Sequence, residues 1–410
     1  MERMFACIEE TVNKSAINQF IMFLKQHSDV TKWFMCSDYC IADKNKSNDV
    51  VTFVLYPYIF DFGDWNKIIN CFQKTDLKHC RHVSKSFCDF TKSGYFFSFS
   101  FILEKDNILY KWKDKTSLDV LLQMYIEMTE NWQITTPNNA ESYKEMNKRL
   151  KKLQNETKQK SFNYKLFGRV VAISFLAGYL RYLLLKEKSN VQIFSWLSDR
   201  DAITNWKNEI YLVFFHIISH CICENNLSQE RETKVQDLYL ADIKNNQFYD
   251  GVNRVADFIC GALADFNYID ESVTGKKQCI LLEDAISDND CLIILNITDH
   301  GVARIVHERR DKMTQREFKA RATELIKLMI DTIADKEYIK LVSSIPPKPS
   351  WASFNDAEPT PENDCLGFGK WLDEQLYSRA IKFAKSRCIA PIRYAIIRAY
   401  LMGGKSYGKY

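Results

Sequence analysis

The strongest constraint on the fold is a short, almost continuous apolar segment at residues 191–198, with the sequence VQIFSWLS. An apolar run of this length is typical of a strand that is buried on both faces of a sheet. Asp199, Arg200 and Asp201 follow it directly. Charged residues that follow a buried strand lie at the carboxyl edge of the sheet, where α/β proteins commonly build their sites. The sequence therefore predicts an α/β protein with a candidate site beside Asp199.

Three further segments have the pattern of strands. Residues 31–42 and 49–58 are rich in Val, Tyr, Phe and Cys, and turn-forming residues separate them, which predicts a hairpin. Residues 94–104 alternate aromatic residues with serine, which predicts another strand. Apolar residues at helical spacing then predict an insertion of two or three long helices near residues 117–188. The expected fold class is a mixed α/β sheet with this helical insertion.

The length of the chain, 410 residues, is enough for two or three domains at roughly 150 residues each. We expect an N-terminal helix at residues 1–30 and an α/β domain at residues 31–270. A mostly helical C-terminal domain with a basic tail is expected at residues 271–410. Prolines gather in residues 343–364, which indicates a structured loop or linker inside that last region.

Composition excludes several classes of protein. Hydrophobic residues make up 46% of the chain, and 13 Gly with 8 Pro are too few for a fibrous or disordered protein. The longest apolar runs, residues 170–180 and 210–223, are shorter than the ~18–20 residues of a membrane span. Acidic residues near the N-terminus do not fit a signal peptide. Thirteen cysteines within apolar segments indicate free thiols. We expect a soluble, cytoplasmic protein without a membrane partner.

Two basic segments point to a polyanionic partner, although the net charge of only +4 carries little information by itself. Residues 144–169 hold nine Lys and Arg against two Glu, and residues 375–410 hold eight basic residues, no acid and five tyrosines. Such side chains can neutralise phosphates and stack on bases. A solvated helix face and a basic tail are the simpler alternative. The candidate nucleic-acid contacts in the tail are Arg379, Lys382, Lys385 and Arg387.

Three aspartates form the strongest candidate for a catalytic group. Asp38 ends the first strand, Asp199 ends the buried strand, and Asp257 lies in an otherwise apolar helix at residues 253–266. A carboxylate on a core-facing helix is costly unless a cation meets it. Three acids from two strands and one helix can converge on a divalent metal, which would activate water for attack on a phosphodiester.

Each aspartate also has a simpler structural interpretation. Asp38 can cap a turn, and Asp199 can cap the helix that follows its strand, because Asp is a preferred capping residue. Asp257 can be the buried partner of Arg254, three residues earlier. Asp201 is expected to be a surface or capping residue. These alternatives stay open at the level of the sequence.

The order of these features resembles that of the RNase H-like superfamily. Within it, the chain resembles bacterial proteins of unknown function that carry an Asp-Glu-Ser-Gly motif in the first strand and Gln-x-Ala-Asp in the terminal helix. The resemblance covers roughly residues 31–270. The residues that carry it are Asp38, then Asp76, Leu77 and Lys78, then Asp199 and Arg200, and finally Ala256, Asp257, Phe258 and Gly261.

The resemblance implies an RNase H-like mixed sheet and a nuclease that depends on Mg²⁺ or Mn²⁺. Asp38, Asp199 and Asp257 match the metal-binding acids, and Lys78 matches a basic residue near the site. Lys78 or Arg200 would contact phosphate in DNA or RNA, between which the sequence does not choose. One role considered for such a nuclease is that of an effector in a bacterial antiviral defence system. A protein partner or a homo-oligomer also stays open.

A non-catalytic subunit is the second hypothesis. Tyr39 and Cys40 follow Asp38 where the family motif has Glu-Ser-Gly, and Arg254 stands near the position of the glutamine. A chain that kept the RNase H-like fold without its metal site would use the basic tail to bind nucleic acid or a protein. Binding of a divalent metal separates the two hypotheses.

Overall fold

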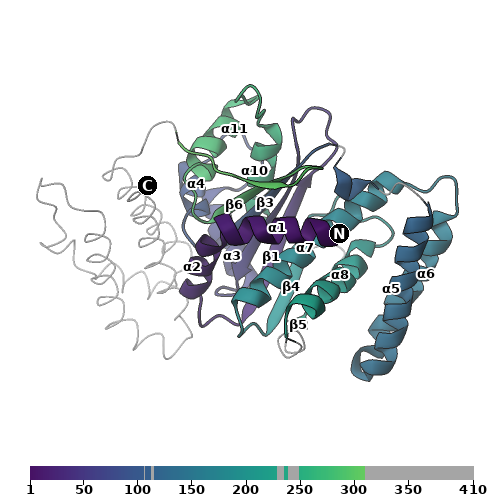
Figure 1. Cartoon of the computed structure of the whole chain (residues 1–410). Helices are drawn as coiled ribbons and strands as arrows, with labels where there is room; N and C mark the ends of the chain where they lie inside the picture. Colours follow the sequence, from purple (N-terminus) through teal and green to yellow (C-terminus); the bar gives the residue numbers. More distant parts are fainter. Residues whose placement is uncertain (106, 112–114, 229–234, 239–248, 310–410) are drawn as a thin grey trace, which may run out of the picture.

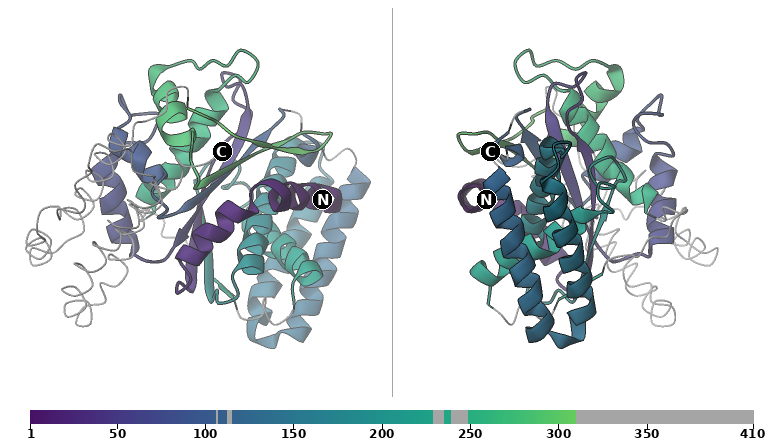
Figure 2. Two further views of the ribbon diagram at one scale, coloured as in Figure 1. Left: turned by 60° about the vertical axis from the view of Figure 1, so that its left-hand side comes forward. Right: turned by 90° about the vertical axis from the view of Figure 1, so that its right-hand side faces the viewer.

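The structure, a computed structural model, describes residues 1–105, 107–111, 115–228, 235–238 and 249–309 (Figure 1). Its centre is a seven-stranded mixed sheet with the order β5-β4-β1-β2-β3-β6-β7. Helices cover both faces of this sheet (Figures 1 and 2), so the expected mixed α/β class is confirmed. The strands are β1 Lys32–Cys40, β2 Asp49–Pro57, β3 Phe97–Leu103, β4 Ile193–Ser198, β5 Gln236–Asp237, β6 Leu292–Ile297 and β7 Val302–Ile305.

The strands expected at residues 31–42, 49–58, 94–104 and 191–198 correspond to β1, β2, β3 and β4. β1 and β2 pair antiparallel, as a hairpin does, whereas β1 and β4 pair parallel. Every residue of β2 and β3 is buried, because helices cover the aromatic and β-branched side chains of both faces. The parallel pairing places the carboxyl ends of β1 and β4 at the same edge of the sheet.

The two faces of the sheet have separate cores, because successive side chains of a strand alternate between faces. In β1, Trp33 and Met35 belong to one core, and Phe34 and Cys36 belong to the other. The first face is covered by α1 Glu2–Ser15, α2 Ile17–Gln26, α7 Tyr164–Glu187 and α8 Ile210–Asn226. The second face is covered by α3 Phe62–Phe72, α4 Lys85–Thr91, α10 Asp250–Asp265 and the turn formed by α11 Lys276–Ile280 and η3 Leu281–Ile286.

The N-terminal segment at residues 1–30 forms two helices where the sequence predicts one. α1 ends at Ser15, and Ala16 leaves the helical conformation with φ −136° and ψ −21° before α2 begins. The break changes the direction of the chain, so that Val12 of α1 and Phe20 of α2 both join the core on the first face.

The helical insertion agrees with the expectation for residues 117–188. It consists of α5 Lys115–Thr135, α6 Ala140–Thr157 and α7, with α5 and α6 forming an antiparallel hairpin beside the sheet (Figures 1 and 2). Among the described helices, α7 alone is long and apolar enough to cross a membrane, but 94% of its most apolar window is buried inside the protein. α7 is therefore a core helix of the kind found in soluble proteins. The cysteines of the described residues are free thiols, as expected.

The sheet continues past residue 270, the boundary expected between two domains. β6 pairs parallel with β3, and β7 pairs antiparallel with β6. These strands join the sheet of the preceding domain because their apolar side chains complete both of its cores. The further helices expected in the C-terminal region, and the basic tail with Arg379, Lys382, Lys385 and Arg387, lie outside the described residues.

Candidate functional site

Two adjacent parallel strands hold Asp38 and Asp199 at one edge of the sheet. The N–H of Asp199 donates to the carbonyl of Ser37 at 2.9 Å, so the two aspartates are neighbours across the strand pair. By alternation, Asp38 shares the face of Cys36 and Asp199 shares the face of Leu197, both of which lie in the core beneath α10. Each carboxyl group affects the pKa of the other, which agrees with their neighbouring positions.

The charges of this pair are mutually unfavourable. Burial, followed by the carboxylates of Asp257 and Asp199, raises the pKa of Asp38 well above its usual value. Burial also raises the pKa of Asp199, although the backbone N–H of Arg200 donates to its carboxylate. Two neighbouring, partly buried carboxylates repel each other when both are ionised, and a cation would compensate that repulsion.

α10 brings a third carboxylate to the same face. Asp257 is half-buried, and its Oδ2 accepts the N–H of Leu77 at 2.7 Å. Gly261 lies one turn later, where a Cβ atom would come within 2.3 Å of the Leu77 side chain. Burial raises the pKa of Asp257 to about 6, and the carboxylates of Asp76 and Asp199 act in the same direction. The three aspartates expected from the sequence thus converge on one face of the sheet.

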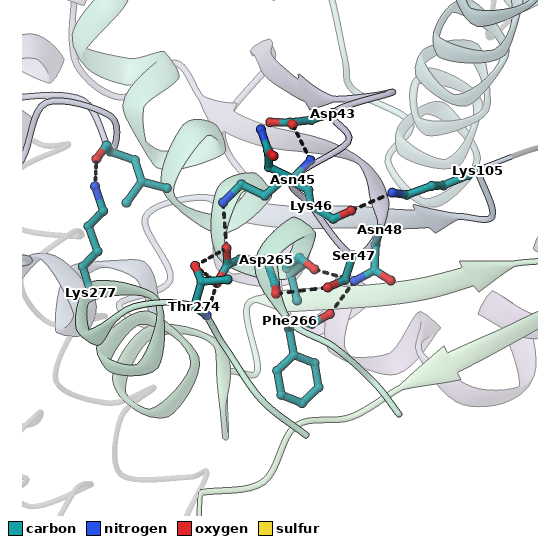
Figure 3. A network of polar contacts seen from close by, with 12 residues as sticks. Asp43, Asn45, Lys46, Ser47, Asn48, Lys105, Asp265, Phe266, Thr274 and Lys277 are labelled. Atoms are coloured by element: carbon teal, nitrogen blue, oxygen red, sulfur yellow. Dashed lines mark hydrogen bonds and ion pairs between the residues drawn. The ribbon is translucent and has the colours of Figure 1, made fainter. Parts of the chain in front are cut away.

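The Leu77 peptide is held from both sides. Its N–H donates to Asp257. Its carbonyl accepts a hydrogen bond from the Nζ of Lys277 at 2.6 Å (Figure 3). Lys78 comes next, but its side chain is exposed and makes no ion pair with any described residue. The structure therefore puts the backbone of Lys78 beside the acids, whereas Lys277 is the lysine whose side chain contacts this loop.

Polar contacts at the C-terminal end of α10 fix that helix against the hairpin of β1 and β2 (Figure 3). Asp265 Oδ1 accepts hydrogen bonds from Lys46 and from Thr274, each at 2.7 Å. The backbone N–H groups of Ser47 and Asn48, in the turn of the hairpin, donate to a carbonyl in the last turn of α10. Because β1 belongs to the same hairpin, these contacts hold Asp257 in register with Asp38.

Two further aspartates belong to the cluster. Burial, followed by the carboxylates of Asp76 and Asp199, raises the pKa of Asp250 to about 6. Asp250 can share the face of Asp257 only in a helix that begins by residue 250, and α10 begins there. Asp76 is more exposed, and its Oδ1 pairs with the Nε of Arg254 at 3.1 Å. Neither residue was expected to belong to the acid group.

The capping roles considered for Asp38 and Asp199 belong to other aspartates. Asp49 Oδ1 accepts the N–H of Ala42 at 2.8 Å, so Asp49 ties the turn that follows β1. After β4, Asp201 Oδ1 accepts two backbone N–H groups of the following turn, at 2.7 and 2.9 Å. Asp201 is therefore a capping residue, as expected, and neither capping contact uses Asp38 or Asp199.

Arg254 has its closest contacts with groups other than Asp257. Besides Asp76, its guanidinium donates to Asn70 Oδ1 at 2.6 Å and to the carbonyl of Gln73 at 2.8 Å. Arg254 still lowers the pKa of Asp257 through its charge, but this is the weakest of the effects on that group. The carboxylate of Asp257 is thus not committed to a salt bridge.

Arg200 provides a cation at the edge of the cluster. It is half-buried, and it donates a hydrogen bond to the hydroxyl of Tyr249. Its charge also lowers the pKa of the neighbouring Asp250. This position, directly after Asp199, is where a phosphate contact was expected from the sequence.

The donor atoms fit a hard divalent cation of the Mg²⁺ type, which binds oxygen ligands. Within the described part of the chain, no group of three or more His, Cys, Asp or Glu side chains is arranged so that it could hold a metal ion. Mg²⁺ commonly takes one or two carboxylates and completes its shell with water and substrate phosphates. The paired carboxyl groups of Asp38 and Asp199 fit a site of that kind, and Asp257 lies beside them.

The acid cluster leads to a pH dependence of stability in the metal-free protein. The pKa of Asp257 is about 6 in the folded protein and ~3.9 in an unfolded chain, so the folded state holds its proton more tightly. Protonation of Asp257 therefore stabilises the folded state. This stabilisation is complete below pH ~4 and is lost as the pH rises through about 6. The measurement is urea unfolding of the wild type and of Asp257→Asn in EDTA. We expect the difference between their unfolding free energies, wild type minus variant, to fall by about 2 kcal/mol between pH 4 and pH 7.

A matched control lies on the same helix. Hydrogen bonds from Lys46 and Thr274 outweigh burial and lower the pKa of Asp265. Asp265 therefore contributes stability that is lost as the pH falls, so Asp265→Asn should show the opposite sign of pH dependence. Equal pH dependence in the two variants would contradict the electrostatic account of the cluster.

Comparison with known proteins adds no relative: no family model, no curated protein and no solved structure matches this chain.

Proposed function

We propose that the protein is a nuclease of RNase H-like fold that uses Mg²⁺ or Mn²⁺ to hydrolyse phosphodiester bonds in DNA or RNA. The observation that carries the proposal is the convergence of Asp38, Asp199 and Asp257. They come from two adjacent parallel strands and one covering helix, and burial, together with the charges of neighbouring aspartates, raises the pKa of each. The mixed sheet and the order of its elements are consistent with that fold. A role in antiviral defence belongs to the same proposal.

The roles of the residues follow from their positions. Asp38 and Asp199 would hold the metal, which supplies a Lewis acid and an activated water when bound. Asp257 and Asp250 would orient water or further cation ligands at the same face. The backbone N–H of Leu77 fixes the orientation of Asp257, and Arg200 would contact a phosphate.

Metal binding should raise the thermal stability of the protein at pH 7.5. A cation that binds only the folded state adds ~2.7 kcal/mol at one hundred times its dissociation constant. It would also relieve the repulsion among the carboxylates. After EDTA treatment, we expect added Mn²⁺ or Mg²⁺ to raise the melting temperature by a few degrees in the wild type, and much less in Asp38→Asn.

The second candidate is a non-catalytic subunit that binds nucleic acid or a protein. It is favoured by the lack, among the described residues, of three side chains arranged to hold a metal. If neither Mn²⁺ nor Mg²⁺ shifts the melting temperature, with or without a bound oligonucleotide, the nuclease proposal fails and this candidate replaces it. Asp265→Asn is the control, because Asp265 is occupied by Lys46 and Thr274 and should leave the metal effect unchanged.

A further inference from the structure

A cavity of about 180 Å³ lies between α6 and the loop that leads from β4 to α8. Arg149, Lys152 and Glu156 line it from α6. Lys207 and Asn208 line it from the loop, and Ile210 adds the N-terminal end of α8, where a helix favours negative charge. The cavity belongs to the basic segment at residues 144–169 and lies apart from the acid cluster.

The charge of the cavity is only partly compensated. The Nζ of Lys207 pairs with Glu156 at 2.5 Å, which neutralises one cation. Lys152 makes no ion pair with any described residue, and the guanidinium of Arg149 donates to the backbone carbonyl of Asn208. Burial lowers the pKa of Arg149, and the charges of Glu145 and Glu209 act in the opposite direction. Among the described residues, Arg149 and Lys152 therefore face the cavity without forming an ion pair, although Glu145 and Glu209 partly offset the charge of Arg149.

The loop wall of the cavity has an unusual backbone. Lys207, Asn208 and Glu209 all have positive φ angles, of 50°, 56° and 61°. Three successive non-glycine residues in the left-handed region cost roughly 1–2 kcal/mol each. The Lys207 ion pair and the contact from Arg149 to Asn208 hold this conformation in place. Strained backbone of this kind is characteristic of ligand clamps.

The same loop joins the cavity to the acid cluster. It begins at Asp199 and reaches Lys207 after eight residues, so the two sites lie within roughly 30 Å of each other. Each strand of a duplex carries one phosphate per ~3.4 Å of helix axis. One nucleic-acid segment of about ten base pairs is therefore long enough to reach both.

We propose that this cavity binds backbone phosphates of the nucleic acid whose phosphodiester bond lies at the acid cluster. The inference rests on the proposed function and adds its substrate-binding surface. Arg149 and Lys152 would contact the phosphates, and Lys207 would position the loop. A phosphate bound here orders the strained loop, whose other end carries Asp199.

The test compares two double variants of the full-length protein that remove the same charge from the same helix. Arg149→Gln with Lys152→Gln removes the two cations of the cavity. Lys144→Gln with Lys148→Gln removes two exposed cations that pair only with glutamates on α6. Binding to a labelled DNA or RNA oligonucleotide is measured by fluorescence anisotropy in EDTA, over a series of salt concentrations, so that cleavage does not contribute.

A plot of log affinity against log salt has a negative slope. We expect the cavity variant to make this slope shallower by about 2 for duplex DNA, or ~1.4 for single strands, and the control variant to leave it nearly unchanged. Lys152→Gln against Lys148→Gln gives a second test, with a change of about 1, if the loss of Arg149 disturbs folding. Equal slopes in cavity and control variants, or no binding by the wild type, overturn the inference. A further outcome is that inorganic phosphate binds the wild type but not the cavity variant, while the salt slopes for the oligonucleotide are equal. That outcome would identify a site for free phosphate and would also overturn the inference.

The outcome is separable from that of the proposed function. If the oligonucleotide binds with the expected change in slope but is not cleaved in Mn²⁺ or Mg²⁺, only the nuclease proposal is contradicted. If the wild type cleaves the oligonucleotide but its cavity and control variants bind with equal slopes, only the inference about the cavity is contradicted.

Discussion

Asp257→Asn should lower the rate of phosphodiester cleavage by at least about a thousand-fold while leaving the protein as stable as the wild type, or more stable, at pH 7.5. A thousand-fold loss corresponds to ~4 kcal/mol of transition-state stabilisation, a size expected when a carboxylate of a metal site loses its charge. Stability is retained because Arg254 pairs with Asp76 and does not depend on Asp257. The amide oxygen of Asn can still accept the N–H of Leu77.

The measurement is a cleavage assay with Mn²⁺ beside a melting curve, on the wild type, Asp257→Asn and Asp265→Asn. Asp265 lies two turns away on α10, and its carboxylate is satisfied by Lys46 and Thr274. Asp265→Asn should therefore lower stability and keep the activity of the folded fraction. A variant at Asp257 that cleaves at the wild-type rate contradicts the proposed site. A large loss of stability at Asp257 would instead show that this carboxylate is structural.

Asp237→Ala should destabilise the protein by about 3–5 kcal/mol, the largest stability effect that we expect from one substitution. Arg181 of α7 is only 3% exposed, and its Nε pairs with Asp237 Oδ1 at 2.9 Å. Its Nη1 contacts Ser219 and Cys223, both of them neutral. Removal of Asp237 breaks a buried salt bridge, and loss of one partner of a buried ion pair costs far more than the salt bridge itself contributes.

Two further variants separate this effect from simple loss of a contact. Arg181→Met combined with Asp237→Ala should recover much of the lost stability, because both members of the buried ion pair are then replaced by apolar side chains. Glu130→Gln breaks an exposed pair with Lys151, where both side chains are about half exposed, and should cost less than ~1 kcal/mol. Urea unfolding of the set measures all three free energies. If the double variant is as unstable as Asp237→Ala alone, the charge argument is wrong.

The sequence was sufficient for those strands that are bounded by clear signals. β1 and β2 are separated by turn-forming residues, and β4 is a short apolar run closed by a charged residue, so their limits agree with the prediction to within two residues. Break points inside apolar helices are harder, because Ala16 carries no turn signal. The place of β6 in the sheet also escaped prediction, since its pairing with β3 joins segments about 190 residues apart.

For the candidate site, periodicity placed Asp38 and Asp199 at strand ends and Asp257 on a core-facing helix. Asp76 was singled out only as part of the Asp-Leu-Lys segment and not as a member of the acid group, because its place beside the other aspartates depends on how α10 packs on α3. Asp250 gave a signal in its spacing of seven residues from Asp257, which is two helical turns. The cavity at Arg149 and Lys207 could not be predicted from the sequence, because a basic helix face does not indicate which loop packs against it.

The contact between the hairpin of β1 and β2 and the end of α10 has a consequence for synthesis of the chain. Asp38 and Asp257 are separated by 219 residues of sequence, and the ribosome adds roughly 5–20 residues per second. Roughly 10–45 s thus pass between the first and the third carboxylate. During that interval the nascent chain has no α10 with which to complete the acid cluster. If the protein is the nuclease proposed above, it cannot cut the messenger from which it is being translated until nearly the whole sheet has been made.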